Sequence, residues 1–183
     1  IVIDELAGWG PPPYGTVLGK KLVKELVLRD VNHPSIILWA NGNEGGWNPE
    51  LDEAFSPWDI QQREVMRPRQ IFGKINSLHY FKYNYLAYDS YQRDRIFLTT
   101  EFLHGCWDEG HGAGLDDYWR LMWENPICAG GFLWNFSDEA VVRTDRNNML
   151  DVDGNHAADG ITGPAREREG SFHTVKEIWA PVH

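Results

Sequence analysis

Three short apolar runs constrain the fold of this chain more than any other feature of its sequence. In the clearest of them, residues 35–40, hydrophobic residues follow one another without alternation, which is typical of a strand buried on both faces of a parallel sheet. The runs cover residues 35–40, 95–100 and 127–136. A shorter β-branched run opens the chain at residues 1–3, and apolar residues recur at helical spacing within residues 16–29. Buried strands that alternate with helices predict an α/β fold made of parallel βαβ units.

The other segments are assigned from local signals. Ser56 and Pro57 predict the N-terminus of a helix that runs to about residue 67. Residues 70–80 hold one or two short strands, and residues 116–123 form a helix. Residues 145–163 are rich in Asp, Asn and Gly and are expected to form loops. A short helix or strand closes the chain at residues 174–179.

Polar side chains gather where the predicted strands end. The first strand ends at Asp4 and Glu5, the second leads into Asn43 and Glu44, and the third ends at Glu101, close to His104. The last strand runs into Trp134, followed by Asp138 and Glu139. Because functional sites of parallel α/β folds lie at the carboxyl ends of the strands, we expect the active residues there.

Charge and aromatic content narrow the class of ligand. The formal net charge of −10 argues against a nucleic acid partner and against a basic membrane-docking surface. No apolar run approaches the roughly 18 residues that a membrane span requires. The chain contains 9 Trp, 7 Tyr and 8 Phe residues. Large aromatic residues most often belong to the core of a protein. They also cover the apolar faces of pyranoses while carboxylates and amides bind hydroxyls, so this acidic, Trp-rich composition is also typical of carbohydrate sites.

Three interpretations of the strand ends are open on the residues alone. Two glutamates on different strands suit glycoside hydrolysis, one as acid/base and the other as nucleophile. Glu101 and His104, with Cys106 or His111, could instead hold a metal ion. In the third interpretation, the acids only cap helices and face solvent.

Several segments resemble family 2 of the glycoside hydrolases, the β-galactosidase and β-glucuronidase family. Residues 29–44, RDVNHPSIILWANGNE, resemble its acid/base motif at the end of strand four of a (β/α)8 barrel. Residues 99–104, TTEFLH, resemble the nucleophile segment at the end of strand seven, and residues 129–136, AGGFLWNF, resemble strand eight. Weaker matches are the LHY segment that ends at Tyr80 and the DGI segment that begins at Asp159.

The resemblance implies a retaining β-glycosidase, similar to the β-galactosidases. Glu101 would be the nucleophile and Glu44 the acid/base, about 5–5.5 Å apart. Glu44 must be protonated at rest, so its pKa would be raised, partly by the charge of Glu101. The substrate-binding residues that the resemblance implies are Asn43 at the 2-hydroxyl, His104 at other hydroxyls, Trp134 as the sugar platform, Tyr80 and Asp159.

The resemblance also implies that residues 1–183 form one incomplete catalytic domain. Residues 1–140 would supply strands three to eight of a partial TIM barrel, with helices outside, and residues 141–183 a loop-rich closing segment. Strands one and two and the preceding β-sandwich domains are missing, so these upstream parts of the full-length protein are expected partners. The sequence does not decide whether the protein forms a homo-oligomer. It does not decide the compartment either; the bacterial cytoplasm and the periplasm are the two expected.

No metal or other cofactor is expected. In the best-known members of the family, the loop after strand three carries Glu and His ligands, whereas residues 6–11 here read LAGWGP. Two alternatives remain beside the glycosidase: a non-catalytic carbohydrate-binding fragment and a metal-dependent hydrolase.

Overall fold

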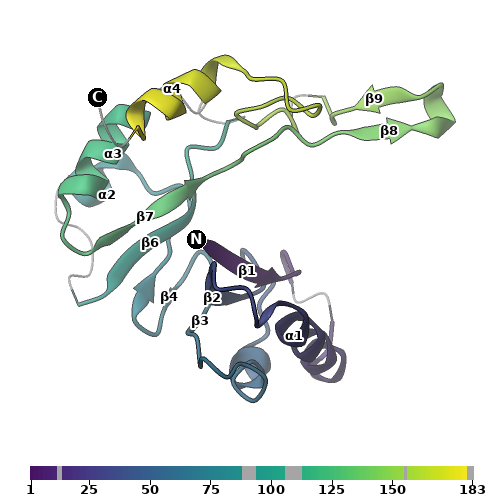
Figure 1. Ribbon diagram of the computed structural model, residues 1–183, viewed down its shortest axis with the longest axis vertical. Coiled ribbons are helices and arrows are strands. Elements are labelled where there is room, and N and C mark those ends of the chain that lie inside the picture. Colours follow the sequence, from purple (N-terminus) through teal and green to yellow (C-terminus); the bar gives the residue numbers. More distant parts are fainter. Residues whose placement is uncertain (12–13, 88–93, 106–112, 155, 181–183) are drawn as a thin grey trace. The chain divides into compact units, whose positions relative to one another are not determined.

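The computed structural model describes residues 1–11, 14–87, 94–105, 113–154 and 156–180. The chain forms two compact units, Ile1–Leu78 and His79–His183, and their elements are labelled in Figure 1. Within the described ranges, no helix combines the length and the hydrophobicity needed to cross a bilayer.

The first unit is built on a parallel sheet. Strands β1 (Val2–Leu6), β2 (Ile36–Asn41) and β3 (Val65–Met66) pair in that order, and both pairings are parallel. Helix α1 (Thr16–Asp30) connects β1 to β2, so these three elements form the predicted βαβ unit. Two further short strands, β4 (Ile71–Phe72) and β5 (Ile75–Asn76), pair with each other as an antiparallel hairpin, which agrees with the short strands expected in residues 70–80.

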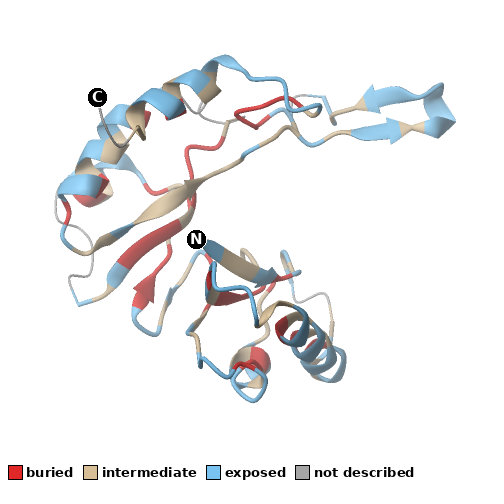
Figure 2. Cartoon of the chain, viewed as in Figure 1, coloured by how far each residue is buried: buried red, intermediate tan, exposed pale blue. Residues whose placement is uncertain are grey.

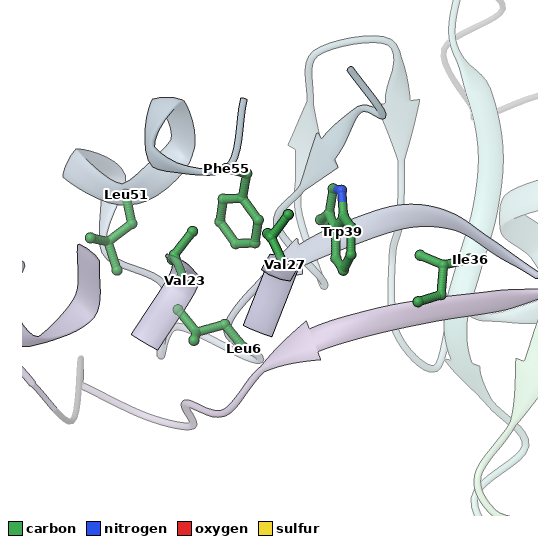
Figure 3. Packing of buried hydrophobic residues seen from close by; sticks show 7 residues of the cluster. All are labelled: Leu6, Val23, Val27, Ile36, Trp39, Leu51 and Phe55. Atoms are coloured by element: carbon green, nitrogen blue, oxygen red, sulfur yellow. The ribbon is translucent and has the colours of Figure 1, made fainter. Parts of the chain in front are cut away.

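The core of the first unit lies between α1, the sheet and the 3-10 helix η1 (Pro49–Ala54). Val23 and Val27 are fully buried one helical turn apart on α1, and they pack with side chains from β1, β2 and η1 (Figure 3). The whole cluster consists of Leu6, Val23, Val27, Ile36, Trp39, Leu51 and Phe55. This packing sets the position of the loops that follow β1 and β2.

Burial of the second predicted strand differs from the expectation. Trp39, Ala40 and Asn41 at the carboxyl end of β2 are buried, but Ile37 is 43% exposed. The strand is therefore covered on both faces only where it approaches the polar loop of residues 42–46. An unbroken apolar run therefore predicts that a strand is buried on average, but it does not predict the burial of each residue.

The predicted helix from Ser56 to about residue 67 is wrong. Helical geometry occurs earlier, in η1, and turns lead from there to β3. The buried carboxylate of Asp59 accepts hydrogen bonds from the backbone N–H groups of Gln61 (3.1 Å) and Arg63 (2.8 Å). A side chain that bonds to the backbone just after it competes with helix formation.

Asp59 is held in place by a second group of contacts. The indole Nε1–H of buried Trp39 donates to Asp59 Oδ2 at 2.9 Å, and Arg63 Nη1 lies 3.1 Å from Asp59 Oδ1. Burial alone would raise the pKa of Asp59, but these hydrogen bonds and the Arg63 charge hold it below its ordinary value. The segment is thus folded around one ionised, buried carboxylate.

A pair of carboxyl groups, Asp4 on β1 and Asp30 at the end of α1, links two elements of the first unit. Asp4 Oδ2 is buried and has no hydrogen-bond partner among the described residues. Burial is the main reason why the pKa of Asp4 is raised to about 6, and the neighbouring Asp30 is the second. Hydrogen bonds from Arg29 (Nε to Oδ2, 2.8 Å) are the main cause that lowers the pKa of Asp30.

We expect the Asp4–Asp30 pair to make the first unit less stable at pH 7 than at pH 5. A carboxyl group whose pKa rises on folding stabilises the native state while protonated, and this contribution is lost as the pH rises from about 4 to about 6. The lowered pKa of Asp30 acts in the opposite direction, but only below about pH 4. Asp4→Asn stays neutral and should raise the free energy of unfolding at pH 7 by about 1 kcal/mol, allowing for solvent screening.

Urea denaturation of the intact protein at pH 5 and pH 7 measures this difference. Asp145→Asn is the matched control, because that carboxylate is 62% exposed and hydrogen bonding from Arg143 lowers its pKa, whereas the pKa of Asp4 is raised. An Asp4→Asn variant with the same pH dependence as the wild type would contradict the expectation.

The second unit is built around a parallel strand pair. Strand β6 (Ile96–Phe102) pairs with β7 (Cys128–Leu133), and helix α3 (Leu115–Glu124) lies between them in sequence. Both strands and α3 lie where the sequence predicts them. A short helix, α2 (Tyr83–Ala87), precedes β6, and α4 (Gly170–Ile178) is the closing element.

Aromatic rings pack the interior of the second unit. Phe97 and Phe102 on β6 are fully buried, and Phe81 packs against both, at ring centroid distances of 5.0 and 6.3 Å. Tyr118 of α3 contacts Phe81 at 5.2 Å. Figure 2 shows β6 largely buried, so its last residues are held by a well-packed strand.

The segment that was expected to be loop contains a β-hairpin. Strands β8 (Val141–Arg143) and β9 (Met149–Asp151) pair antiparallel, and the hairpin extends away from the rest of the second unit (Figure 1). Asn147 and Asn148 both have positive φ, 54° and 60°, as a tight turn requires. The Asn-Asn pair between two apolar dipeptides was the sequence signal for this hairpin.

Candidate active site

Glu44 belongs to the loop that follows β2. Gly42 and Gly45 have φ values of 73° and 96°, and Glu44 itself has a φ of 40°. Glycine adopts such φ values readily, whereas other residues rarely do. The two glycines therefore allow the unusual backbone conformation that positions Glu44. Its side chain is 16% exposed.

Trp9 and Arg69 both contact the carboxylate of Glu44. The indole Nε1–H of Trp9 donates to Glu44 Oε2 at 3.1 Å, and Arg69 Nη1 lies 3.6 Å from the same oxygen. Trp9 comes from the loop after β1 and Arg69 from the segment between β3 and β4. The acid therefore lies where three loops of the first unit converge.

Asn43 holds this loop through its backbone. Its N–H donates to Gly8 O at 2.6 Å, and its carbonyl accepts from Gly46 N at 2.6 Å. These bonds tie the loop after β2 to the loop that carries Trp9. The expected contact of the Asn43 side chain with a sugar 2-hydroxyl stays a prediction.

Gly46 is in closest contact with the Trp9 loop. A Cβ atom at this position would lie 2.3 Å from both Gly8 C and Trp9 N, which are backbone atoms that cannot rotate away. We expect Gly46→Ala to displace the Trp9 loop, to lower the free energy of unfolding by about 1–3 kcal/mol and to reduce kcat/KM, although no functional group is removed. Gly170→Ala is the matched control, since a Cβ there meets nothing within 4 Å. Urea denaturation and steady-state kinetics check both variants; equal behaviour of the two would contradict the expectation.

Glu101 lies at the carboxyl end of β6 and is only 8% exposed. The Tyr80 hydroxyl donates a short hydrogen bond to Glu101 Oε2. His79 Nδ1 lies 3.5 Å from the same oxygen, and His79 Nε2 is 2.6 Å from Thr100 Oγ1. The carboxylate is thereby fixed in one orientation by groups on the preceding segment.

The backbone around Glu101 is fixed as well. Tyr80 N–H donates to Glu101 O at 3.0 Å, and Thr99 Oγ1 donates to the same carbonyl at 2.8 Å. Tyr80 has a φ of 47°. These contacts hold the main chains of Tyr80 and Glu101 together, so the hydroxyl bond does not depend on side-chain rotamers alone.

A second group of predicted residues is centred on Asp159, which is 4% exposed. Trp134 Nε1 donates to Asp159 Oδ2 at 2.8 Å, and Asn135 Nδ2 donates to Oδ1 at 3.0 Å. His104 Nε2 lies 3.6 Å from Asp159 Oδ2. Asp159 thus orients the indole that was expected to form the sugar platform, and it contacts the histidine that was expected to bind hydroxyls.

Ring contacts join the two groups within the second unit. The ring centroids of Tyr80 and His104 are 5.5 Å apart, and those of His104 and Trp134 are 6.5 Å apart. The structure therefore brings together the five predicted site residues of this unit: Glu101, Tyr80, His104, Trp134 and Asp159. Glu44 and Asn43 belong to the first unit, and their placement opposite Glu101 stays a prediction.

Sequence reasoning missed four residues of these groups. Trp9 and Arg69 contact Glu44, His79 contacts Glu101, and Asn135 contacts Asp159. Two of them stand directly beside a predicted residue, His79 before Tyr80 and Asn135 after Trp134. For Arg69 the sequence carries no local signal, because its contact depends on how separate loops meet.

The metal interpretation of Glu101 and His104, with Cys106 or His111, stays untested. Glu101 contacts Tyr80 and His79, whereas His104 contacts Asp159. The loop of residues 6–11 supplies a carbonyl to Tyr14, a carbonyl to Asn43 and an indole N–H to Glu44, and none of its side chains is a carboxylate or an imidazole. The loop therefore lacks the Glu and His side chains with which this loop binds metal in the best-known family members. Cys106 and His111 lie outside the described residues.

Parallel strands that carry buried carboxylates and aromatic side chains at their carboxyl ends are the arrangement of α/β barrel enzyme domains. Comparison with known proteins agrees with this. The model of the TIM barrel domain of the glycosyl hydrolases of family 2 matches residues 19–182. The chain therefore belongs to glycosyl hydrolase family 2, as part of its TIM barrel domain.

Curated relatives and solved structures are similar to the chain along most of its length. A β-galactosidase of Actinobacillus pleuropneumoniae is 26% identical over 179 residues, which cover 85% of this chain and 17% of that protein. A β-galactosidase of Priestia megaterium is 29% identical over 180 residues, 87% of this chain and 17% of that protein. A Bifidobacterium dentium β-glucuronidase complexed with coumarin-3-O-glucuronide matches 100% of this chain and 38% of its own, with a TM-score of 0.73 and 18% identity. The chain thus spans under a fifth of the length of these curated relatives.

Proposed function

We propose that the intact protein hydrolyses a β-glycosidic bond with retention of configuration. Glu101 attacks the anomeric carbon, and Glu44 gives its proton to the glycosidic oxygen as the bond to the leaving group breaks. Glu44 then takes a proton from water, and the water oxygen displaces Glu101 from the anomeric carbon. The proposal requires a carboxyl separation of about 5–5.5 Å.

The observation that carries the proposal is the placement of Glu101. A buried carboxylate at the carboxyl end of a parallel strand, oriented by a tyrosine hydroxyl and a histidine, is a preorganised nucleophile. Burial limits the access of bulk water to the carboxylate, and the Tyr80 hydroxyl and His79, both at Oε2, hold it in a defined orientation for attack on carbon.

The group around Asp159 provides the proposed sugar site. The Trp134 ring contacts His104, whose ring in turn contacts Tyr80, and Asp159 fixes the Trp134 indole N–H. His104 is held between Tyr80 and Trp134 and would bind a ring hydroxyl. Asn43 would bind the 2-hydroxyl. A pyranose would thus lie with its apolar face on Trp134 and its hydroxyls toward polar groups.

A β-galactoside is the substrate class that the sequence relatives favour. These curated relatives are named β-galactosidases. The β-glucuronidase structures of Bifidobacterium dentium and Parabacteroides merdae are 18% and 14% identical to the chain, so their similarity concerns the fold. We further propose that residues 1–140 supply strands three to eight of the barrel and residues 141–183 its closing segment, in one catalytic domain that upstream strands and sandwich domains complete.

Assays of the intact protein on aryl β-galactosides, β-glucosides and β-glucuronides test the function. Proton NMR of the first product detected should show the β-anomer; an α-anomer would mean inversion and overturn the retaining mechanism. Binding of a sugar without turnover of any glycoside would establish the carbohydrate-binding alternative. Loss of activity on dialysis against a chelator, restored by zinc, would establish the metal-dependent hydrolase.

A further inference from the structure

Trp9 combines an exposed ring with a fixed polar edge. The residue is 72% exposed, although tryptophan is among the side chains that proteins bury most. Its Nε1–H is engaged by Glu44 Oε2 at 3.1 Å. The edge of the indole is therefore bound to an acid while its faces remain available.

The main chain gives this indole little freedom. Gly8 O accepts the hydrogen bond from Asn43 N at 2.6 Å, and the Gly46 backbone packs so closely on Gly8 and Trp9 that a Cβ would have no space. The ring is thus carried by a loop that two backbone contacts tie to the Glu44 loop. An exposed aromatic ring that is held in place by contacts other than its own burial is suited to bind a ligand.

The chemistry of Glu44 identifies which part of a substrate would reach Trp9. The proton of an acid/base residue goes to the glycosidic oxygen, and that oxygen carries the leaving group. The leaving group therefore has to lie beside Glu44, where the indole lies too. Arg69 Nη1, 3.6 Å from the same oxygen and on a side chain that is 60% exposed, adds a donor for hydroxyls.

We propose that Trp9 is the binding platform for the leaving group, and that it takes a ring with a flat apolar face: a second pyranose in an oligosaccharide, or an aryl group that imitates one. This inference rests on the proposed role of Glu44 as acid/base. Through its hydrogen bond, Trp9 is at the same time a positioning residue for that acid.

Kinetics of Trp9→Ala and Trp9→Phe in the intact protein test the proposal. The substrates share one β-linked sugar and differ in the leaving group: methanol, a second hexose or a phenol. For Trp9→Ala, kcat/KM for the hexose and phenol leaving groups should fall about tenfold relative to that for methanol, the effect of losing about 50 Å² of apolar contact. Trp9→Phe keeps a ring and should retain most of this preference, while the alkaline limb of its pH profile shifts because the hydrogen bond to Glu44 is lost.

Added acceptor sugar provides a second measurement, because it would occupy the same platform after the leaving group departs. In Trp9→Ala, the ratio of transglycosylation to hydrolysis should fall about tenfold. Trp58→Ala is the matched control, because Trp58 is also exposed, at 37%, but its ring contacts Lys24 Nζ at 4.3 Å. Circular dichroism verifies folding, and the small packed area of Trp9 predicts little loss.

The proposal is overturned if Trp9→Ala changes kcat/KM equally for methanol and ring leaving groups, or leaves the transglycosylation ratio unchanged. Those results are distinct from failure of the proposed function, in which the wild type cleaves none of the substrates or Glu44 and Glu101 variants cleave them normally.

Discussion

Glu101→Gln is expected to abolish turnover of every glycoside that the intact protein cleaves, by at least about 10⁴-fold in kcat. The amide has nearly the same shape as the carboxylate, so Tyr80 and His79 keep their places around it. An amide oxygen is a poor nucleophile, however, and no glycosyl-enzyme forms. Because the first chemical step itself is lost, a better leaving group should not restore the rate.

Steady-state kinetics with one activated and one unactivated substrate check this loss, and mass spectrometry with a slow-turnover fluoroglycoside checks the covalent step. The wild type should gain the mass of one glycosyl group, and Glu101→Gln should not. Glu177→Gln, on the exposed side of α4, is the matched control. Labelling of any other residue in the wild type would remove Glu101 from the role of nucleophile.

Glu44→Ala is expected to divide substrates by their leaving groups. An unactivated glycoside needs a proton on its leaving oxygen, so kcat/KM should fall by about 10²–10⁴-fold. A dinitrophenolate leaves without a proton, so formation of the glycosyl-enzyme should remain fast. Hydrolysis of that intermediate still lacks a general base, and the glycosyl-enzyme should accumulate as a burst followed by slow turnover.

Azide separates loss of the general base from a general loss of structure. A small anion needs no base to attack the anomeric carbon, and the space left by the Glu44 side chain admits it. Azide should therefore accelerate turnover of the dinitrophenyl substrate by Glu44→Ala and yield a β-glycosyl azide, with no such effect on Glu101→Gln. Glu53→Ala, an exposed substitution on η1, should resemble the wild type. An α-glycosyl azide from Glu44→Ala, or no acceleration at all, would contradict the assignment.

The sequence alone determined the alternation of strands and helices. The apolar runs that became β2, β6 and β7 have no competing local signal, and α1 follows a helical period that nothing interrupts. The prediction from local signals was wrong where a side chain forms hydrogen bonds with the backbone that a helix would otherwise use. Asp59 draws the N–H groups of Gln61 and Arg63 to itself, and the helix that Ser56 and Pro57 indicate does not form. That turn can be recognised only from the tertiary structure, in which Asp59 is buried and accepts a hydrogen bond from the Trp39 indole.

The candidate site residues could be predicted from the sequence because carboxylates at the ends of buried strands are uncommon and because their motifs are specific to one family. Their partners were decided by the tertiary structure. Tyr80 lies 21 residues from Glu101, Asp159 lies 25 residues from Trp134, and Trp9 lies 35 residues from Glu44. No sequence periodicity extends over such separations. These hydrogen bonds form because parallel strands and their packed helices deliver distant loops to the same end of each unit, and because glycines such as Gly46 let two backbones approach where a Cβ would hold them apart.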